Sequence, residues 1–597
     1  MVKRNLITAY KNLIDKYNIS SSIDNNKILS IIKESLRDFM GQHSNAAIYC
    51  YGQHTEQMMA KFIFELRDIK YIIDNNSGNL HSNGFKIISR DEIDTHKIDG
   101  VIISSYKYRK EIRRELLEKY QAKDVLDVYE VLEKKGISAD REFYRMDTPY
   151  AYYKQINYLQ RKIASSDRTS LNELKKLYIS LIAEYIKIKD FLSALNKIEE
   201  CSKDFGISIS EEFKDSIENL YKMELQAASE ISKNNVLMFC FDGLRNIDVS
   251  EECMGKLALF IKKNATWFHN AYSYSTSTFE SLVPAYSENT DQRTQYYLKA
   301  YVNSNECRFV QYAKSQEREI YFYDGGACYV QDGSIHYTGR DQTVTEKMWD
   351  FIIDAINTDN GLFYLHEEDE SHFSYVNPYT TDILLTDGLN IMFDYLEKHG
   401  SSLRTDYNRQ HKDALMYLDD VVTPVLQCLK CNILIYADHG NLILDYHTQL
   451  NNIKEIDFSA GNQLIRIPFA LIDNKRIPEQ HEPLFSLINI NDVIISMLDN
   501  KKYSVNDNEF IKIGRSAIYN PDFKFLYAKA DKNTELLAFE GFVFKEGWKL
   551  LIFSNGLTKL YNVQTDEPLE DDNLKSFLLS KVEKFISVCE AKNIIEP

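Results

Sequence analysis

Two short, mainly apolar runs, each ending at an aspartate, constrain the fold of this chain more than any other feature. Val236–Phe241 is followed by Asp242, and Asn432–Ala437 is followed by Asp438-His439-Gly440. Runs this short are typical of strands buried on both faces of a parallel sheet rather than of helices. Since open α/β sheets place their ligands at the carboxyl ends of the strands, we expect Asp242, Asp438 and His439 to form part of one site.

Aspartate and histidine side chains are hard-to-borderline ligands for a divalent cation such as Zn²⁺ or Mn²⁺, and a hydroxyl beside such a cation can become a nucleophile. The chain offers hydroxyls at 273–278, which reads Ser-Tyr-Ser-Thr-Ser-Thr. Such a run is also typical of a solvated loop, and Ser277 or Thr278 would cap a helix that begins near Phe279. Together these residues favour a metal-dependent transferase or hydrolase that acts on a phosphoryl-type group.

The composition is that of an ordinary globular protein, with 44% hydrophobic and 27% charged residues. The formal net charge of −17 gives no electrostatic footprint for nucleic acid, so we expect no nucleic-acid partner. The nine cysteines are scattered and indicate a reducing compartment rather than a disulfide framework. We find no N-terminal signal core and no window of roughly 18 apolar residues. We therefore expect a cytoplasmic protein without a transmembrane segment, or one attached peripherally at the inner membrane.

Residues 1–138 are predicted to form a half-Rossmann-like α/β domain. Strand candidates at 46–51, 71–74 and 101–105, with helices between them, give a βαβ rhythm. The first turn reads Gly-Gln-His-Thr and so lacks the GxGxxG dinucleotide fingerprint. Nucleotide binding stays open for this domain, as do acceptor recognition and a purely structural role.

Three further segments are expected along the chain. Residues 139–232 have broad apolar faces at helical spacing, which predicts a helical connector. Residues 233–504 alternate strands and helices, as a mostly parallel sheet flanked by helices requires. In 505–597, a hairpin that turns at 545–547, a strand at 558–562 and a helix near 574–591 predict a small antiparallel appendage with a helical tail. The fold class is therefore α/β.

Four motifs, in order along 233–575, resemble the alkaline phosphatase superfamily, specifically its sulfatase-like transferase branch. Phe241-Asp242-Gly243-Leu244-Arg245 is similar to the first metal strand, and 276–284 to the nucleophile segment of phosphoethanolamine transferases. Ala437-Asp438-His439-Gly440 is similar to the metal-binding DHG segment, and 548–570 to the sulfatase C-terminal signature. The resemblance implies an alkaline phosphatase-like, mostly parallel sheet for this part of the chain.

The resemblance also implies which residues carry the chemistry. Thr278 is expected to be the nucleophile, with Thr276 as its rival. A divalent metal ion, Zn or Mn, is expected to be held by Asp242, Thr278, Asp438 and His439.

Four more residues receive a role from the same resemblance. His366 and His447 are expected to join the metal ligands. His372 is expected to hold the transferred group or a second cation, or to act as acid or base on the leaving group and the acceptor, unless it is an ordinary surface histidine. Arg245 is expected to neutralise a phosphoryl oxygen, or else to pair with a nearby acid.

The activity implied is transfer of a substituted phosphoryl group, namely O-methyl phosphoramidate, phosphoglycerol or phosphoethanolamine. The group would pass from a nucleotide-activated, CDP-type donor to a sugar hydroxyl of a capsular or surface polysaccharide, through a phosphothreonine intermediate. The chain lacks the CxPxR context in which sulfatases make formylglycine, which argues against sulfate-ester hydrolysis. A phosphodiesterase or sulfatase-like hydrolase is the alternative enzyme, and a polysaccharide-binding protein with a decayed site is the alternative without catalysis.

Overall fold

The computed structural model of this chain divides into two compact units, the first comprising Met1–Ile19, Thr148–Thr294 and Tyr301–Pro597, the second Ser20–Asp147 with 295–300. The described residues are 2–19, 25–52, 54–55, 58–59, 62–74, 85–106, 108–118, 124–137, 148–166, 170–290, 302–323, 330–338, 342–368, 370–372, 375–380, 401–441, 460–473, 478–504, 506–515 and 534–586. The predicted segment boundaries at 138/139, 232/233 and 504/505 stay predictions.

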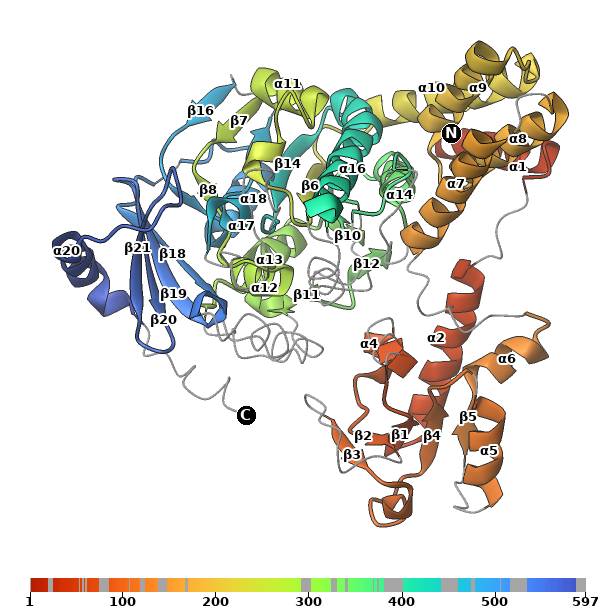
Figure 1. Ribbon diagram of the computed structural model, residues 1–597, viewed down its shortest axis with the longest axis horizontal. Helices are drawn as coiled ribbons and strands as arrows, with labels where there is room; N and C mark the ends of the chain where they lie inside the picture. The colour runs from red at the N-terminus through yellow and green to blue at the C-terminus, as the bar shows by residue number, and fades with distance from the viewer. Residues whose placement is uncertain are drawn as a thin grey trace. The chain divides into compact units, whose positions relative to one another are not determined.

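The second unit is built on a five-stranded, all-parallel sheet in the order β3-β2-β1-β4-β5 (Figure 1). Alternate strand residues face opposite cores, because Ile48 and Ile102 pack with α2 whereas Ala47 and Val101 pack with α5. The predicted βαβ pattern is confirmed. The elements are β1 (Ala46–Tyr49), β2 (Tyr71–Ile73), β3 (Lys86–Ile88), β4 (Gly100–Ile103), β5 (Val125–Leu126), α2 (Asn25–Gln42), α4 (Ile63–Leu66), α5 (Arg109–Glu118) and α6 (Val128–Lys134).

Five helices of the first unit pack against one another outside its sheets. Apolar residues recur at helical spacing, so that α8 buries Leu174, Tyr178 and Leu181 along one face. The ring of Tyr17, just after α1, lies 4.3 Å from that of Phe213 in α10. The helical pattern predicted for 139–232 is confirmed by the helices between 148 and 229, whereas 139–147 and 167–169 fall outside the described residues. These helices are α1 (Val2–Lys16), α7 (Thr148–Ser165), α8 (Leu171–Lys187), α9 (Phe191–Phe205) and α10 (Glu211–Ser229).

An eight-stranded, mostly parallel sheet in the order β12-β10-β13-β6-β14-β15-β7-β16 forms the centre of the first unit (Figure 1). Strand β15 is antiparallel to both of its neighbours, and the remaining pairs are parallel. The central strands β13, β6 and β14 are buried along their whole length. The strands are β6 (Val236–Phe241), β7 (Ala265–Phe268), β10 (Glu319–Tyr323), β12 (Ile335–Thr338), β13 (Gly361–Glu367), β14 (Asn432–Ala437), β15 (Phe469–Ile472) and β16 (Glu479–His481).

Helices flank this sheet in two groups, so the predicted α/β fold class is confirmed (Figure 1). Helices α11, α14 and α16 form one group, and α12, α13 and α18 form the other. The helices are α11 (Gly255–Asn264), α12 (Thr278–Ser287), α13 (Arg308–Ser315), α14 (Val344–Ala355), α16 (Ser401–Cys428), α17 (Asn462–Ile465) and α18 (Ile490–Leu498). Two short ribbons pair β8 (Ala271–Tyr272) with β17 (Phe485–Ser486), and β9 (Val302–Asn303) with β11 (Val330–Gln331).

The C-terminal part is a four-stranded antiparallel sheet, as predicted, in the order β18 (Phe510–Arg515), β19 (Phe539–Phe544), β20 (Trp548–Phe553) and β21 (Thr558–Asn562). Gly547 ends the β19–β20 turn with a φ of 92°, a conformation that favours glycine. Helix α20 (Asp572–Val582) packs Leu578 against Phe542 and Leu550 of this sheet. The predicted hairpin and helical tail are therefore both present.

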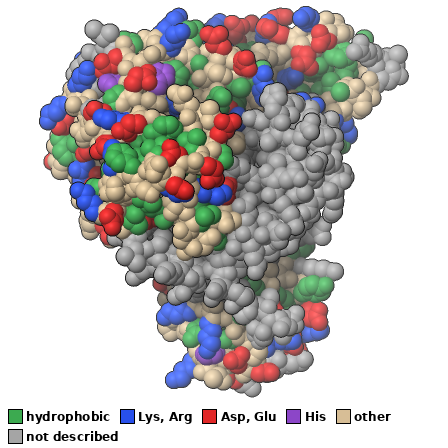
Figure 2. All heavy atoms as spheres, turned by 60° about the vertical axis from the view of Figure 1, so that its left-hand side comes forward, with side chains coloured by type: hydrophobic (Ala, Val, Ile, Leu, Met, Phe, Trp, Pro, Cys, Tyr) green, Lys and Arg blue, Asp and Glu red, His purple; other side chains and the backbone are tan. Residues whose placement is uncertain are grey.

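The surface of the first unit mixes charges of both signs. Figure 2 shows Lys and Arg side chains interspersed with Asp and Glu on one face. Ion pairs in the C-terminal part, such as Lys581 with Glu509 and Lys559 with Glu535, contribute to this mixture. Among the described residues, no helix combines the length and the hydropathy that crossing a membrane demands.

The buried carboxyl of Glu224, on α10, makes the stability of the first unit depend on pH. It lines a small cavity with Asp190 and Tyr221, and burial together with Asp190 raises the pKa of Glu224 from 4.5 to about 8. Because the pKa is higher in the folded state, stability falls as the pH rises from 4.5 to about 8. We expect Glu224→Gln to raise the free energy of unfolding by roughly 1–3 kcal/mol at pH 8.5 and to change it little at pH 5, measured by urea denaturation.

Asp215→Asn is the matched control, since Asp215 is exposed on the same helix. It should leave the free energy of unfolding unchanged at both pH values. An equal effect of Glu224→Gln at pH 5 and pH 8.5 would contradict the assignment.

Candidate metal centre and nucleophile

The carboxyl ends of β6 and β14 bring two aspartates side by side. Phe241 and Ala437 end these strands as register partners, so Asp242 and Asp438 follow at the same edge of the sheet. Their side chains are buried, at 6% and 0% exposure. Gly243, with a φ of 73°, turns the chain and donates its N–H to Asp438 Oδ1 over 3.0 Å. Strand register and turn geometry therefore hold the two carboxylates together.

Thr278 faces these carboxylates from the first position of α12. Its Oγ1 lies 3.3 Å from each carboxylate oxygen of Asp242 and 3.2 Å from Nε2 of His439. Ser277, the N-cap residue, makes no side-chain capping hydrogen bond. Thr278 thus stands at the positive end of the α12 dipole, where negative charge is stabilised. The hydroxyl brought to Asp242 and His439 is that of Thr278, not that of its rival Thr276.

Buried serines hold the loop that leads into α12. The hydroxyl of Ser273 donates to the carbonyl of Ser275 over 2.6 Å, and that of Ser281 donates to the same carbonyl over 3.1 Å. The hydroxyl of Ser275 in turn donates to Glu280 over 2.8 Å. Ser273 and Ser275 of the Ser/Thr-rich run therefore hold the loop in place, whereas the hydroxyl of Thr278 faces the site.

The carbonyl of Gly440 orients the imidazole of His439. Its Nδ1 lies 2.6 Å from that carbonyl oxygen, so Nδ1–H donates there and Nε2 faces the carboxylates, where it would offer its lone pair to a cation after losing its proton. That Nε2 lies 3.3 Å from Asp242 Oδ1 and 3.4 Å from Asp438 Oδ2. A Cβ at Gly440 would come within 2.0 Å of the carbonyl oxygen of Gln463, so only glycine permits this approach to α17.

The donor set fits a divalent cation. Asp438 Oδ1 accepts N–H groups from Gly243 and His439, whereas Oδ2 is buried with no hydrogen-bond partner among the described residues. Such an atom calls for an ion or water, because leaving a buried acceptor unpaired costs about 1–3 kcal/mol. Carboxylate oxygens of Asp242 and Asp438, Nε2 of His439 and Oγ1 of Thr278 form the mixed oxygen and nitrogen set that Zn²⁺ and Mn²⁺ accept.

The charges in the site are strongly coupled. Burial opposes ionisation of Asp242, but the neighbouring His372, His439 and His366 outweigh it and hold the pKa of Asp242 well below its usual range. Burial lowers the pKa of His439, but Asp438 and Asp242 outweigh that effect and raise it to about 9. Burial and the adjacent Asp242 raise the pKa of Asp438. In the absence of a cation, protonated histidine is therefore the positive charge that balances the carboxylates.

His372 lies at the rim of this centre, whereas Arg245 is engaged in an ion pair. His372 Nε2 is 3.9 Å from Asp242 Oδ1, and its side chain is 40% exposed. Arg245 binds Asp248 through both Nε and Nη2, at 2.9 and 2.6 Å. The roles of His372 toward the transferred group and of Arg245 toward a phosphoryl oxygen stay predictions.

Of the two further histidines predicted as metal ligands, the structure describes His366 but not His447. His366, on β13, is fully buried, with Nε2 at 3.9 Å from Asp242 Oδ2 and Nδ1 at 3.3 Å from Glu368 Oε1. His366 therefore lies beneath the centre rather than at its open side. His447 falls outside the described residues, and its role as a ligand stays a prediction.

Sequence reasoning missed Asn441 and Ser371, which tie the site together. Asn441 Nδ2 donates to the carbonyl of Gly243 over 2.6 Å and to that of Ser371 over 2.9 Å. Ser371 Oγ donates to the carbonyl of Asp242 over 2.7 Å. The place of Asn441 directly after the DHG segment was the only signal in the sequence.

Helix α7 supports the loop that carries His372. Tyr153 Oη donates to Glu370 over 2.5 Å, and Asn157 Nδ2 donates to the carbonyl of Asn377 over 3.2 Å. Glu370 also accepts the N–H of Val344, at the start of α14. Tyr153 and Asn157 lie far from Glu370 and Asn377 in the sequence, so sequence spacing gave no indication of these contacts.

Comparison with known families gives one match, outside the site. The family model described as "C2185-like, N-terminal" matches residues 42–125, which run from before β1 to β5 in the second unit. No curated protein matches the chain.

Several solved structures resemble part of the chain at low identity. The phosphonate monoester hydrolase SpPMH from Silicibacter pomeroyi matches with 11% identity and a TM-score of 0.44, covering 59% of this chain and 94% of its own. The 2-O GAG sulfatase BT1596 gives the same identity and TM-score, covering 59% and 91%. The C-terminal periplasmic domain of EcEptC from Escherichia coli matches at 14% identity and a TM-score of 0.32, covering 46% and 85%. At these levels the function has to follow from the site residues themselves.

Proposed function

We propose that this chain is a divalent-cation-dependent transferase that moves a substituted phosphoryl group onto a sugar hydroxyl through a phosphothreonine intermediate at Thr278. The observation that carries the proposal is the position of Thr278 Oγ1, within 3.3 Å of Asp242 and 3.2 Å of His439 Nε2 at the start of a helix. A hydroxyl in such a setting is an activated nucleophile. The four motifs of the alkaline phosphatase superfamily in this part of the chain support the same reading.

Asp242, Thr278, Asp438 and His439 would hold the cation. When bound, a divalent cation lowers the pKa of a coordinated hydroxyl and neutralises charge on a phosphoryl group. The residues themselves contribute rigidity, because Asp438 is fixed by two backbone N–H groups and the His439 ring by Gly440. Thr278 needs no rearrangement to present Oγ1 to the substrate, which lowers the entropic part of the barrier.

In the first step Thr278 Oγ1 attacks phosphorus. The Oγ1–P bond forms, the bond from phosphorus to the nucleotide leaving group breaks, and the hydroxyl proton leaves to water. Before the attack, the carboxylate of Asp242 accepts the hydrogen bond of this hydroxyl and so orients it. The positive end of the α12 dipole stabilises the phosphoryl oxygens of the intermediate.

In the second step an acceptor hydroxyl attacks the same phosphorus. The bond from the acceptor oxygen to phosphorus forms, the Oγ1–P bond breaks, and Oγ1 takes a proton from water, which regenerates Thr278. The side chain of His372 is 40% exposed, and its Nε2 lies 3.9 Å from Asp242. His372 is therefore proposed to protonate the nucleotide that leaves in the first step and to take the proton of the acceptor hydroxyl in the second.

The donor class in this proposal is a CDP-linked substituted phosphoryl group, and the acceptor is a sugar of a capsular or surface polysaccharide. O-Methyl phosphoramidate, phosphoglycerol and phosphoethanolamine are the candidate groups. These assignments rest on the resemblance to capsule-modifying transferases. The cytoplasmic location is proposed on the scattered cysteines of the chain, which indicate a reducing compartment. The parallel sheet of the second unit is proposed to recognise the acceptor.

Covalent trapping tests the nucleophile. We expect acid quenching of a reaction with Mn²⁺ and an activated phosphodiester to leave a phosphoryl adduct on Thr278, located by peptide mass spectrometry. Thr278→Ala should remove the adduct and lower turnover at least about 10³-fold, because the nucleophile is lost.

Thr276→Ala is the matched control, as it removes a hydroxyl two residues away and should keep the adduct. Thr278→Ser should also retain it. A Thr278→Ala protein that still forms the adduct would contradict the assignment.

Product analysis distinguishes transfer from hydrolysis. The protein is incubated with a CDP-linked donor and Mn²⁺, with and without an acceptor polysaccharide, and the products are identified by mass spectrometry. We expect CMP together with a sugar that carries the new phosphorus group. CMP formed at the same rate without acceptor, and an unmodified sugar, would assign the alternative, a phosphodiesterase that uses the same Thr278 centre.

A further inference from the structure

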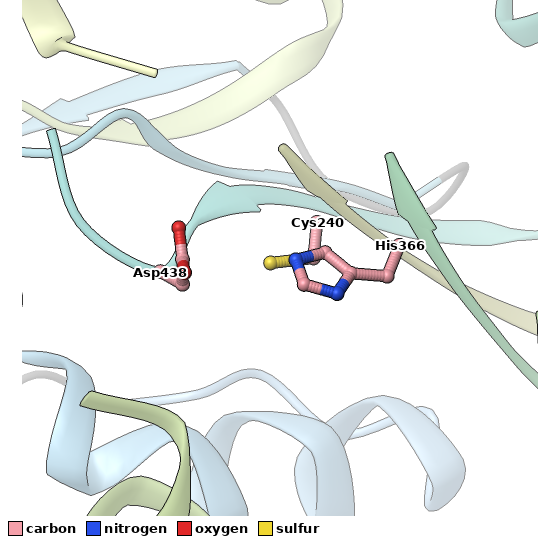
Figure 3. A group of neighbouring side chains, drawn as sticks. All are labelled: Cys240, His366 and Asp438. Atoms are coloured by element: carbon pink, nitrogen blue, oxygen red, sulfur yellow. The ribbon is translucent and has the colours of Figure 1, made fainter. Parts of the chain in front are cut away.

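Three fully buried side chains with metal-binding atoms converge beneath the centre just described. They are Cys240, His366 and Asp438, each with an exposure of 0%. One ligand atom of each lies within 4.8 Å of the corresponding atom of the others. Figure 3 shows the sulfur of Cys240 between the ring of His366 and the carboxylate of Asp438. The arrangement combines a thiol, an imidazole and a carboxylate in the buried interior.

The order and register of the strands bring these three side chains together. Cys240 on β6 and His366 on β13 are register partners in a parallel pair, so their side chains project from the same face. Asp438 follows the last residue of β14, the neighbour of β6 on its other side. Two ligands thus lie on adjacent strands and the third directly follows another strand, and sites built on strands are held more precisely than sites on loops.

Among the described residues, Nε2 of His366 and Oδ2 of Asp438 lack the hydrogen bonds that buried groups normally have. Nδ1 of His366 forms an ion pair with Glu368 Oε1 at 3.3 Å. Nε2 lies 3.9 Å from Oδ2 of Asp242. Buried polar atoms left unpaired in a native protein point to an ion or water that completes them.

The donor chemistry selects the kind of ion. Thiolate and imidazole are the soft-to-borderline ligands that zinc and cobalt prefer, and the hard cations Mg²⁺ and Ca²⁺ avoid. A thiolate and a carboxylate supply two negative charges to balance a divalent cation. Burial raises the pKa of the Cys240 thiol to about 12, so a bound cation has to displace the thiol proton, as it does at zinc–cysteine sites.

We propose that Cys240, His366 and Asp438 bind a second divalent cation of the zinc type, buried in the sheet and adjoining the proposed catalytic cation at Asp438. This second site does not depend on the proposed transfer reaction, since only Asp438 is shared. The cation would fix the position of the Asp438 carboxylate. It would also bind the buried atoms that have no hydrogen-bond partner among the described residues.

Cobalt absorption spectroscopy tests this site without reference to activity. The metal-free full-length protein is titrated with Co²⁺, and bound cobalt is counted by elemental analysis. We expect two cobalt ions per chain and an intense near-ultraviolet thiolate-to-cobalt charge-transfer band. Cys240→Val should lose the band and one cobalt ion, whereas Asp242→Asn should keep the band.

Cys431→Val is the matched control, because Cys431 is also buried in the first unit and lies outside the cluster. It should keep the band and both ions. Wild-type protein that binds cobalt without a thiolate band overturns the proposal whether or not Cys240→Val folds. Retention of the full band in Cys240→Val also overturns it, and failure to trap an adduct at Thr278 leaves the spectrum unaffected.

Discussion

The parallel register of β13, β6 and β14 is the constraint on which the site depends. Because these strands end level with one another, Cys240, Asp242, His366 and Asp438 emerge at one edge of the sheet. A shift of either neighbour by one residue would turn its side chains to the opposite face and dissolve the cluster. The apolar strands therefore position the polar site, and the burial that stabilises them also removes water from the carboxylates.

Placing two carboxylates next to each other in a buried site is unfavourable unless positive charge accompanies them. In this chain His372, His439 and His366 together lower the pKa of Asp242. Oδ2 of Asp438, which has no hydrogen-bond partner among the described residues, marks where more positive charge is accommodated. A bound cation would reduce the repulsion between the two buried carboxylates. Because Thr278 Oγ1 lies within hydrogen-bond distance of Asp242, it is a candidate nucleophile and not only a residue at a helix start.

Much of the fold was predictable because its signals are local. The bounds of β6 and β14 follow from short apolar runs, and the hairpin near Gly547 follows from its turn residues. The meeting of Asp242 and Asp438 also follows, since both end parallel strands. Contacts that depend on tertiary packing were not predictable: Tyr153 with Glu370, and Cys240 with His366, join segments whose separation carries no periodic signal.

The central claim is that Asp242, Asp438, His439 and Thr278 hold a divalent cation. Anomalous diffraction from crystals grown with Mn²⁺ tests it most directly, because it locates the ion without assuming a substrate. The account predicts an anomalous peak within about 2.3 Å of Asp242, Asp438, His439 Nε2 and Thr278 Oγ1. A fully ordered site with no peak at saturating Mn²⁺ or Zn²⁺, and Thr278 still bonded to Asp242, would contradict it.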